Sequence, residues 1–203
     1  MTYFEFDFPH TKEYHDLKNI FINYSKIDNI KFNLFQGDIT TGINWIWAEN
    51  ENTLNYFTRF LDSINIDKKL KEISNETFKL RGASFITIDH NIVNSSDFHY
   101  DVSCQYDRND TDILTILFPL YELEENMGHL EYKKNEDTNV YTYDINKLII
   151  WDSCKFLHRT QPYVIREPKQ RVLVSINLST DKKWAVNAVN NCLRYQGNLL
   201  WID

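Results

Sequence analysis

The sequence is poor in the residues that break or cross-link a chain. Among its 203 residues are five Gly, four Pro and three Cys. So little Gly and Pro excludes collagen-like and low-complexity chains. The cysteines, Cys104, Cys154 and Cys192, form no Cys-x-x-Cys pair, which argues against a zinc ribbon or a thioredoxin-type centre. We expect all three to be structural.

Long apolar runs and an excess of basic charge are also lacking. No stretch approaches the roughly 18 apolar residues that a membrane span requires, and the N-terminus carries acids where a signal peptide carries Lys or Arg. The net charge is −7, from 22 basic and 29 acidic residues, so the chain is poorly suited to displacing counterions from nucleic acid. We expect a soluble, cytoplasmic protein that binds neither membrane nor nucleic acid.

The length suits one domain over residues 1–203. We divide it into a helical and extended N-terminal support (1–79), a β core (80–180) and a C-terminal extension (181–203). Apolar spacings of three and four predict helices over 14–24 and 53–64, the second capped by Asn52 or Thr53. Two short apolar runs around Gln36-Gly37-Asp38 predict a hairpin over 32–47.

From about residue 80 the pattern has a period of two. Short β-branched or aromatic runs occur at 84–88, 113–118, 128–132, 140–143, 148–151 and 171–178. Turn-like clusters rather than helices separate them, which is typical of an antiparallel sandwich or barrel. The predicted fold class is mainly β with packing helices.

One pair of metal-ligating residues lies near the start of this region. His99 and Asp101 are two residues apart, so at the end of a strand they project from one face. His158 follows a predicted strand. Two His and one carboxylate on one face of Fe(II) form the ligand set of non-haem iron oxygenases. The alternative is a solvated strand end, and His129-Leu130-Glu131 is a rival pair that we assign to a packed strand.

The last predicted strand begins with a charged residue. On it Arg171, Leu173, Ser175 and Asn177 share one face, and the residues between them share the other. A face that starts with Arg and continues through Ser and Asn predicts a polar barrel interior with a ligand inside. Arg166 is a competing anion anchor, but it lies in a predicted loop between Pro162 and Pro168, so we prefer Arg171.

The order of these motifs resembles the Fe(II)/2-oxoglutarate-dependent oxygenases, including the prolyl-hydroxylase-like members. The resemblance covers about residues 80–180. It rests on Phe98-His-Tyr-Asp and on four longer segments, 114–120, 126–132, 146–162 and 171–178. Gly128 stands alone where the family often has two glycines, and the usual Arg-x-Ser is absent because Ser175 falls four residues after Arg171.

The resemblance implies a double-stranded β-helix, a jelly-roll or cupin-like barrel. It implies that His99, Asp101 and His158 bind Fe(II), and that Arg171 binds 2-oxoglutarate. Ser175 and Thr115 are further candidates for contact with 2-oxoglutarate. The implied reaction uses O₂ to hydroxylate an amino acid, a small metabolite or a protein side chain, and a carboxylate at position 101 favours hydroxylation over halogenation.

Two features outside the resemblance complete the expectations. Trp45 and Trp47 are large rings beside a turn in the unplaced N-terminal segment, and we expect one of them to line the substrate entrance. Two other classes stay open: a cupin-type metal dioxygenase that does not use 2-oxoglutarate, and a non-catalytic β-barrel binding protein in which the triad is incidental.

Overall fold

The architecture is taken from a computed structural model. It describes residues 3–24, 31–33, 43–48, 50–88, 92–93, 96–102, 110–164 and 169–196. Across these ranges, none of the helices combines the length and the apolar character needed to cross a bilayer. The chain order is β1 (Phe4–Asp7), α1 (Lys12–Tyr24), β2 (Lys31–Asn33), β3 (Ile43–Trp47), α2 (Glu51–Ser63), α3 (Ile66–Ile73), β4 (Lys79–Ile88), β5 (Ile92–Val93), β6 (Ile113–Pro119), β7 (Leu130–Lys134), β8 (Asp137–Tyr141), β9 (Lys147–Asp152), β10 (His158–Thr160), β11 (Tyr163–Val164), β12 (Arg171–Ser179) and α4 (Lys183–Tyr195).

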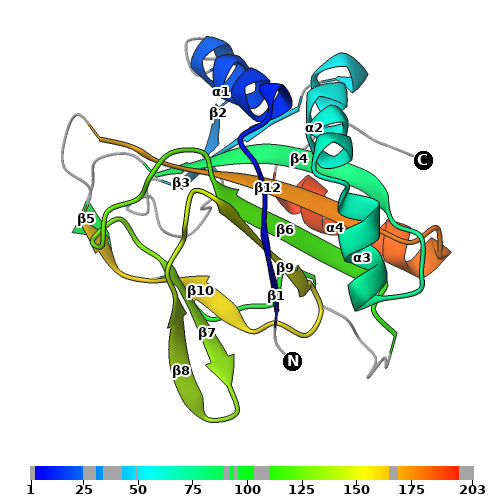
Figure 1. The fold of residues 1–203 in the computed structure, drawn as a ribbon. Coiled ribbons are helices and arrows are strands. Elements are labelled where there is room, and N and C mark those ends of the chain that lie inside the picture. Colours follow the sequence, from blue (N-terminus) through cyan, green and yellow to red (C-terminus); the bar gives the residue numbers. More distant parts are fainter. Residues whose placement is uncertain are drawn as a thin grey trace.

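A seven-stranded antiparallel sheet in the order β1-β9-β6-β12-β4-β3-β2 forms the centre of the molecule. A three-stranded sheet, β10-β7-β8, and a two-stranded sheet, β11-β5, complete the described strands. In Figure 1 the β7–β8 hairpin projects below the large sheet, on the side away from α1 and α2. The expected fold class, mainly β with packing helices, is therefore confirmed.

The strand β12 carries the alternation that the sequence predicts. Both of its edges are paired, with β4 on one side and β6 on the other. Its apolar side chains, Val172, Val174, Ile176 and Leu178, join the core beneath the helices. Its other face, Arg171, Leu173, Ser175 and Asn177, lines a cavity. One face of the sheet therefore packs in the core, and the other lines the cavity.

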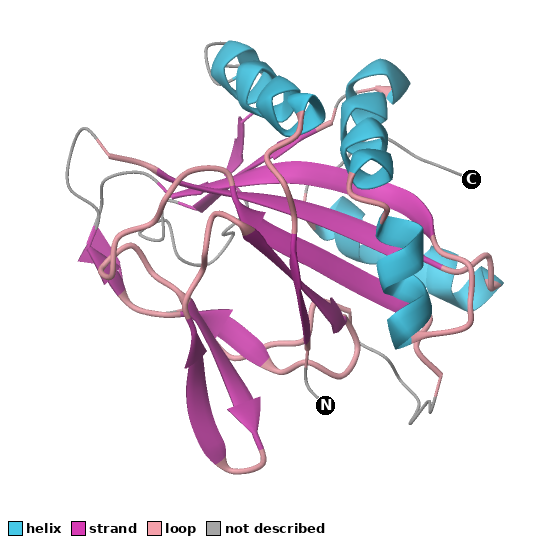
Figure 2. Cartoon of the chain, viewed as in Figure 1, coloured by secondary structure: helices cyan, strands magenta, loops and turns pink. Residues whose placement is uncertain are grey.

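Helices α1, α2 and α3 cover the apolar face. In Figure 2, where every helix is cyan, α1 and α2 lie above the strands and α3 lies in front of them, whereas α4 lies behind. Aromatic rings fill the space between helices α1 to α3 and the sheet. Phe60 of α2 lies 4.9 Å from Phe118 of β6 between ring centroids, and Phe8 lies 5.5 Å from Phe60. Large buried rings of this kind supply much of the hydrophobic stabilisation of a core.

The expected helices and hairpin are present, with some boundaries moved. The N-cap of α2 is Asn50 rather than Asn52 or Thr53, and its side chain accepts a hydrogen bond from Thr53 N at 3.0 Å. Strands β2 and β3 pair as the predicted hairpin, whereas its turn at 36–38 lies outside the described residues. The first 79 residues also contribute three strands to the large sheet, because β1 pairs with β9 and β3 with β4.

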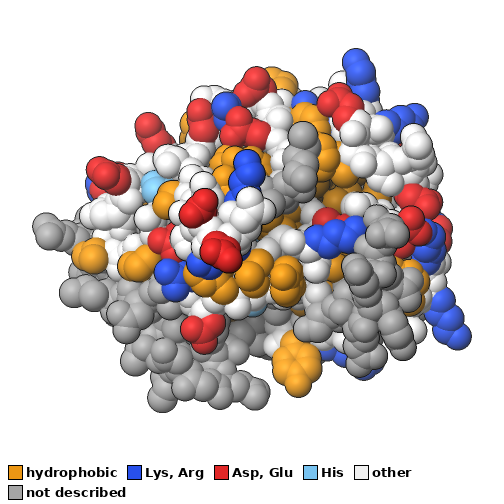
Figure 3. Space-filling model, turned by 90° about the horizontal axis from the view of Figure 1, so that it is seen from below, with side chains coloured by type: hydrophobic (Ala, Val, Ile, Leu, Met, Phe, Trp, Pro, Cys, Tyr) orange, Lys and Arg blue, Asp and Glu red, His pale blue; other side chains and the backbone are white. Residues whose placement is uncertain are grey.

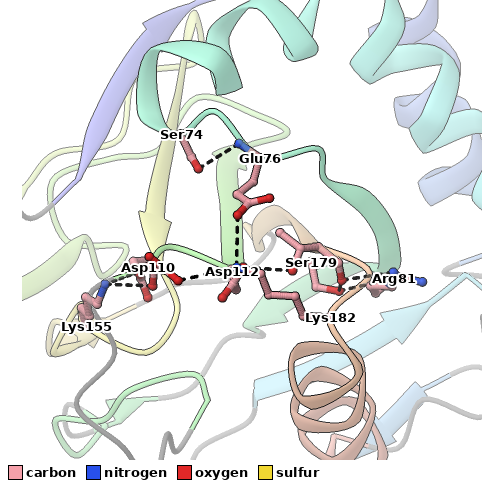
Figure 4. A network of polar contacts seen from close by, with 10 residues as sticks. Ser74, Glu76, Arg81, Asp110, Asp112, Lys155, Ser179 and Lys182 are labelled. Carbon is pink, nitrogen blue, oxygen red and sulfur yellow. Dashed lines mark hydrogen bonds and ion pairs between the residues drawn. The ribbon is translucent and has the colours of Figure 1, made fainter.

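The helix α4 was not predicted, and a polar network fixes its start to the sheet (Figure 4). The buried carboxylate of Asp112 lies 2.8 Å from Lys182 Nζ, which also contacts Glu76 at 3.1 Å. The buried Arg81 donates to Ser179 Oγ at 2.9 Å and pairs with Asp181 at 2.7 Å. Because burial strengthens such pairs only when they are well satisfied, this network sets the direction in which α4 leaves β12.

The cysteines differ in state. Cys154 is disulfide-bonded and Cys192 is free, while Cys104 lies outside the described residues. Disulfides are uncommon in a reducing cytoplasm, so this bond gives no support to the predicted compartment.

We expect Phe60→Ala to lower the free energy of unfolding by about 3–5 kcal/mol, because it leaves a cavity in the aromatic core. Urea denaturation followed by circular dichroism measures the change. Ile22→Ala is the control, since Ile22 is 44% exposed on α1 and its truncation should cost less than about 0.5 kcal/mol. Equal losses in the two variants would contradict this description of the core.

Candidate metal and co-substrate site

Backbone pairing brings the two candidate histidine ligands together. His99 and His158 form an isolated antiparallel bridge, with N–H···O distances of 2.9 and 3.0 Å in the two directions. His158 also starts β10, which pairs with β7. The ring centroids of the two histidines are therefore only 4.6 Å apart, although 59 positions separate them in the numbering.

The carboxylate of Asp101 completes a three-residue cluster. Its Oδ1 lies 3.4 Å from His158 Nε2. One ligand atom from each of His99, Asp101 and His158 lies within 4.8 Å of the others. Their spacing is compatible with a single ion bound between them, and two imidazoles with one carboxylate suit Fe(II).

Hydrogen bonds orient both imidazoles toward the centre of this cluster. His99 Nδ1 lies 2.8 Å from the carbonyl of Asp97, and His158 Nδ1 lies 2.9 Å from the carbonyl of Phe156. A carbonyl only accepts, so each Nδ1 carries the proton. The Nε2 lone pair of each ring is then free to bind a metal, the arrangement typical of ligating histidines.

The charges of the three groups also suit metal binding. Burial raises the pKa of Asp101, but the charge and hydrogen bond of His158 outweigh it, so the pKa falls well below the usual range. Burial and the repulsion from His158 lower the pKa of His99. Burial lowers the pKa of His158, but Asp101 outweighs burial and the pKa is raised. A metal ion at this site therefore competes with a second proton for His158 Nε2.

The cluster lies in the wall of a cavity of about 440 Å³. Arg171 lines the same cavity and is 2% exposed. Burial lowers its pKa, and the groups that favour its charge are the phenols of Tyr143 and Tyr163, not a carboxylate. Its Nε has no hydrogen-bond partner among the described residues. Because a buried cation is costly without an anion, this end of the cavity suits an anionic ligand.

Aromatic side chains form the surroundings of Arg171. Its guanidinium carbon lies 5.6 Å from the ring centroid of Tyr143. Tyr163 packs against Gly128, where φ is +78° and a Cβ would come within 2.9 Å of the Tyr163 Cβ. The single glycine of the expected Gly-rich segment is thus required by both backbone conformation and close packing.

His129 and Glu131, the rival pair of metal-ligating residues, each contact a different partner. His129 is buried, and its Nδ1 accepts a hydrogen bond from the backbone N–H of Tyr143 at 3.2 Å. Glu131 forms an ion pair with Arg159 at 2.6 Å. Neither residue belongs to the metal-ligating cluster found among the described residues. The other rival, Arg166, lies outside the described residues.

The remaining predicted site residues have different positions. Thr115, Ser175 and Trp45 line the cavity. Thr115 Oγ1 donates to Asp101 Oδ2 at 2.7 Å. Trp47 lies in the cluster that packs against α4, and its indole N–H donates to the carbonyl of Gln196 at 2.7 Å.

Sequence reasoning missed several lining residues. Tyr143 follows β8 and was treated only as part of a strand, although its alternation with Tyr141 could have indicated a shared face. Tyr195 and Gln196, at the end of α4, also line the cavity, and the Asn-rich tail gave no signal for them. Tyr195 is 90% exposed, so the cavity opens beside it.

The surface around this side of the molecule carries mixed charge. In the part drawn in Figure 3, Lys and Arg side chains of the described residues are interspersed with Asp and Glu, and hydrophobic side chains lie between them.

No family model and no curated protein sequence matches the chain. Solved structures do share its fold. A prolyl hydroxylase from Trichoplax adhaerens, in complex with a hypoxia inducible factor peptide, matches with a TM-score of 0.66 and 14% identity, covering 89% of this chain and 84% of that one. The epimerase SnoN with Fe³⁺, alpha ketoglutarate and nogalamycin RO gives 0.69 and 8%, covering 88% and 79%. HygX from Streptomyces hygroscopicus, with nickel and 2-oxoglutarate, gives 0.61 and 8%, covering 89% and 84%.

We expect His99→Ala and His158→Ala each to weaken Co(II) binding by more than about 100-fold, since even removing an outer partner of a ligand typically costs 10–100-fold. Competition with a chelating indicator under anaerobic conditions measures the affinity. His15→Ala serves as the control, because His15 is exposed on α1. Unchanged affinity in both ligand variants would exclude the metal site.

Proposed function

We propose that the chain is an Fe(II)- and 2-oxoglutarate-dependent dioxygenase, built on a double-stranded β-helix, that hydroxylates an unactivated C–H bond. The observation that carries the proposal is that one cavity holds both the His99–Asp101–His158 cluster and the buried Arg171, which pairs with no carboxylate of the described residues. The fold shared with iron and 2-oxoglutarate oxygenases supports it.

The residues that line the cavity fit both Fe(II) and 2-oxoglutarate. His99 Nε2, His158 Nε2 and Asp101 Oδ1 would hold Fe(II) and leave adjacent positions open, as three protein ligands do on one face of an ion. With O₂, the bound iron and 2-oxoglutarate supply the oxidation: 2-oxoglutarate, O₂ and R–H become succinate, CO₂ and R–OH. The two rivals, a metal dioxygenase without a 2-oxo acid and a binding protein, leave Arg171 without an assigned partner.

The protein's own contribution is binding and orientation. Arg171 binds the far carboxylate of 2-oxoglutarate through charge-assisted hydrogen bonds. The phenol of Tyr143 remains protonated because burial raises its pKa, so it can donate to the same carboxylate. Ser175 lies on the same face of β12 and is a further contact. Thr115 lines the same cavity, and its hydroxyl proton is engaged by Asp101.

Strands β3 and β4 give the cavity an apolar wall on one side of β12. Register pairs Trp45 of β3 with Ile86 of β4, and Ile43 with Ile88. Trp45, Ile43 and Ile86 all line the cavity. We assign this wall to the substrate, with Trp45 in contact and Trp47 supporting the wall from beneath α4. The relatives bind a peptide in one case and nogalamycin RO in another, so a protein side chain, an amino acid and a small metabolite all remain candidate substrates.

The first test uses no substrate. We expect Fe(II) and 2-oxoglutarate, added anaerobically, to give a saturable visible charge-transfer band. Arg171→Leu should weaken 2-oxoglutarate binding by at least about 10-fold, since it removes a charge-assisted contact worth about 1.5–3 kcal/mol, while metal affinity persists. Arg59→Leu, on the exposed face of α2, is the matched control.

Two other results of that titration would favour the alternative functions. Metal binding without a band, in wild type and Arg171→Leu alike, would favour the dioxygenase that does not use 2-oxoglutarate. No metal binding by wild type would favour the non-catalytic binding protein.

We expect Trp45→Ala to raise the substrate KM by about 10-fold, because truncation removes roughly 1.5 kcal/mol or more of apolar contact. It should also lower the ratio of hydroxylated product to succinate, since the substrate is held less firmly. Both are measured by mass spectrometry of product and succinate. Tyr56→Ala, half-exposed on α2, is the control. An unchanged KM together with an unchanged ratio would remove Trp45 from the substrate wall.

A further inference from the structure

Two side chains donate hydrogen bonds to the same oxygen of the Asp101 carboxylate. Thr115 Oγ1 donates to Oδ2 at 2.7 Å, and Trp151 Nε1 donates to the same Oδ2 at 2.8 Å. Neither hydrogen bond involves Oδ1, which is the oxygen 3.4 Å from His158 Nε2. The two oxygens of one side chain therefore have different environments.

The sheet places the two donors side by side. Thr115 of β6 is the register partner of Trp151 of β9, so their side chains project from the same face of the sheet. The buried Ser153 lies 2.8 Å from Thr115, oxygen to oxygen. The single hydroxyl proton of Thr115 is directed at Asp101, so Ser153 is the donor in this second contact. A chain of hydrogen bonds thus runs from Ser153 through Thr115 to Oδ2.

The backbone beside Asp101 is fixed as well. Val102 N–H donates to the carbonyl of Ser153 at 3.2 Å. Cys192 Sγ, on α4, donates to the carbonyl of Asp101 at 2.9 Å. Together with the His99–His158 bridge, these contacts restrain the main chain on both sides of Asp101.

We propose that Thr115 and Trp151 are positioning residues that make Asp101 a one-oxygen ligand. This inference rests on the proposed iron site. A carboxylate can bind a metal through one oxygen or chelate it through both. Two charge-assisted hydrogen bonds on Oδ2 hold that oxygen away from the ion and present Oδ1. The coordination position that chelation would occupy is thereby kept for 2-oxoglutarate or O₂.

The test removes each donor with little change in volume. Trp151→Phe removes the indole N–H and retains a ring beside Phe156 and His158, which lie 5.1 and 5.0 Å from Trp151 between centroids. Thr115→Val removes the hydroxyl, whereas Thr115→Ser retains it. The matched controls are Trp184→Phe on α4 and Thr58→Val on α2, which make the same chemical changes in side chains that do not donate to the Asp101 carboxylate. The probe is Co(II), whose visible spectrum reports its coordination.

We expect Trp151→Phe and Thr115→Val each to weaken Co(II) binding by about 10–100-fold and to shift the Co(II) visible bands, because Oδ2 becomes free to approach the ion. Thr115→Ser and both controls should retain the wild-type spectrum. The double variant should show a larger spectral shift than either single variant. A thermal melt of each metal-free variant shows whether it is folded.

Folded variants that bind Co(II) with wild-type affinity and spectrum would overturn the inference and leave the iron site standing. A weaker affinity with an unchanged spectrum in every variant would also overturn it, because it would show a general loss of packing. If wild type itself binds no Co(II), the proposed function fails, and the inference fails with it.

Discussion

The structure depends on the pairing of β12 along both of its edges. Because side chains alternate across a strand, this one strand presents apolar residues to the helices and polar residues to the cavity. A shift of the register by one residue would exchange the two faces. It would place Arg171 in the aromatic core and an apolar side chain in the cavity. Pairing with β4 and β6 together excludes that shift, so fold and site are specified by the same hydrogen bonds.

The metal cluster is built from segments that only the fold brings together. His99 and His158 face each other through a backbone bridge, and Asp101 is held from β6, β9 and α4. The helix α4 has two tasks, because the ion pairs at its start fix its direction and its last residues reach the cavity. The cavity that holds the three ligand residues opens to solvent beside Tyr195.

Much of this could be predicted from the sequence, wherever the signal is local and periodic. The alternation of apolar and polar residues predicts the long strands. The order of His99, Asp101, His158 and Arg171 along the sequence indicates an iron and 2-oxoglutarate site. Helix α4 was missed because its apolar stripe, Ala185, Val189 and Leu193, is embedded among asparagines. Strands β1 and β10 were missed because four and three residues carry little periodicity and depend on distant partners. The indole N–H of Trp151 was unpredictable for another reason, since only the register with Thr115 directs it to Asp101.

The buried guanidinium of Arg171 makes the stability of the protein depend on the concentration of an anion that binds beside it. In the part of the chain that the structure describes, no carboxylate pairs with this buried cation, which makes the ligand-free fold less stable than its packing alone would allow. An anion that enters the cavity binds only the folded chain, so its concentration adds directly to the free energy of unfolding. Marginal changes of that size alter how often a chain opens and is degraded. The abundance of the protein in a cell would then follow the supply of the anion that binds beside Arg171.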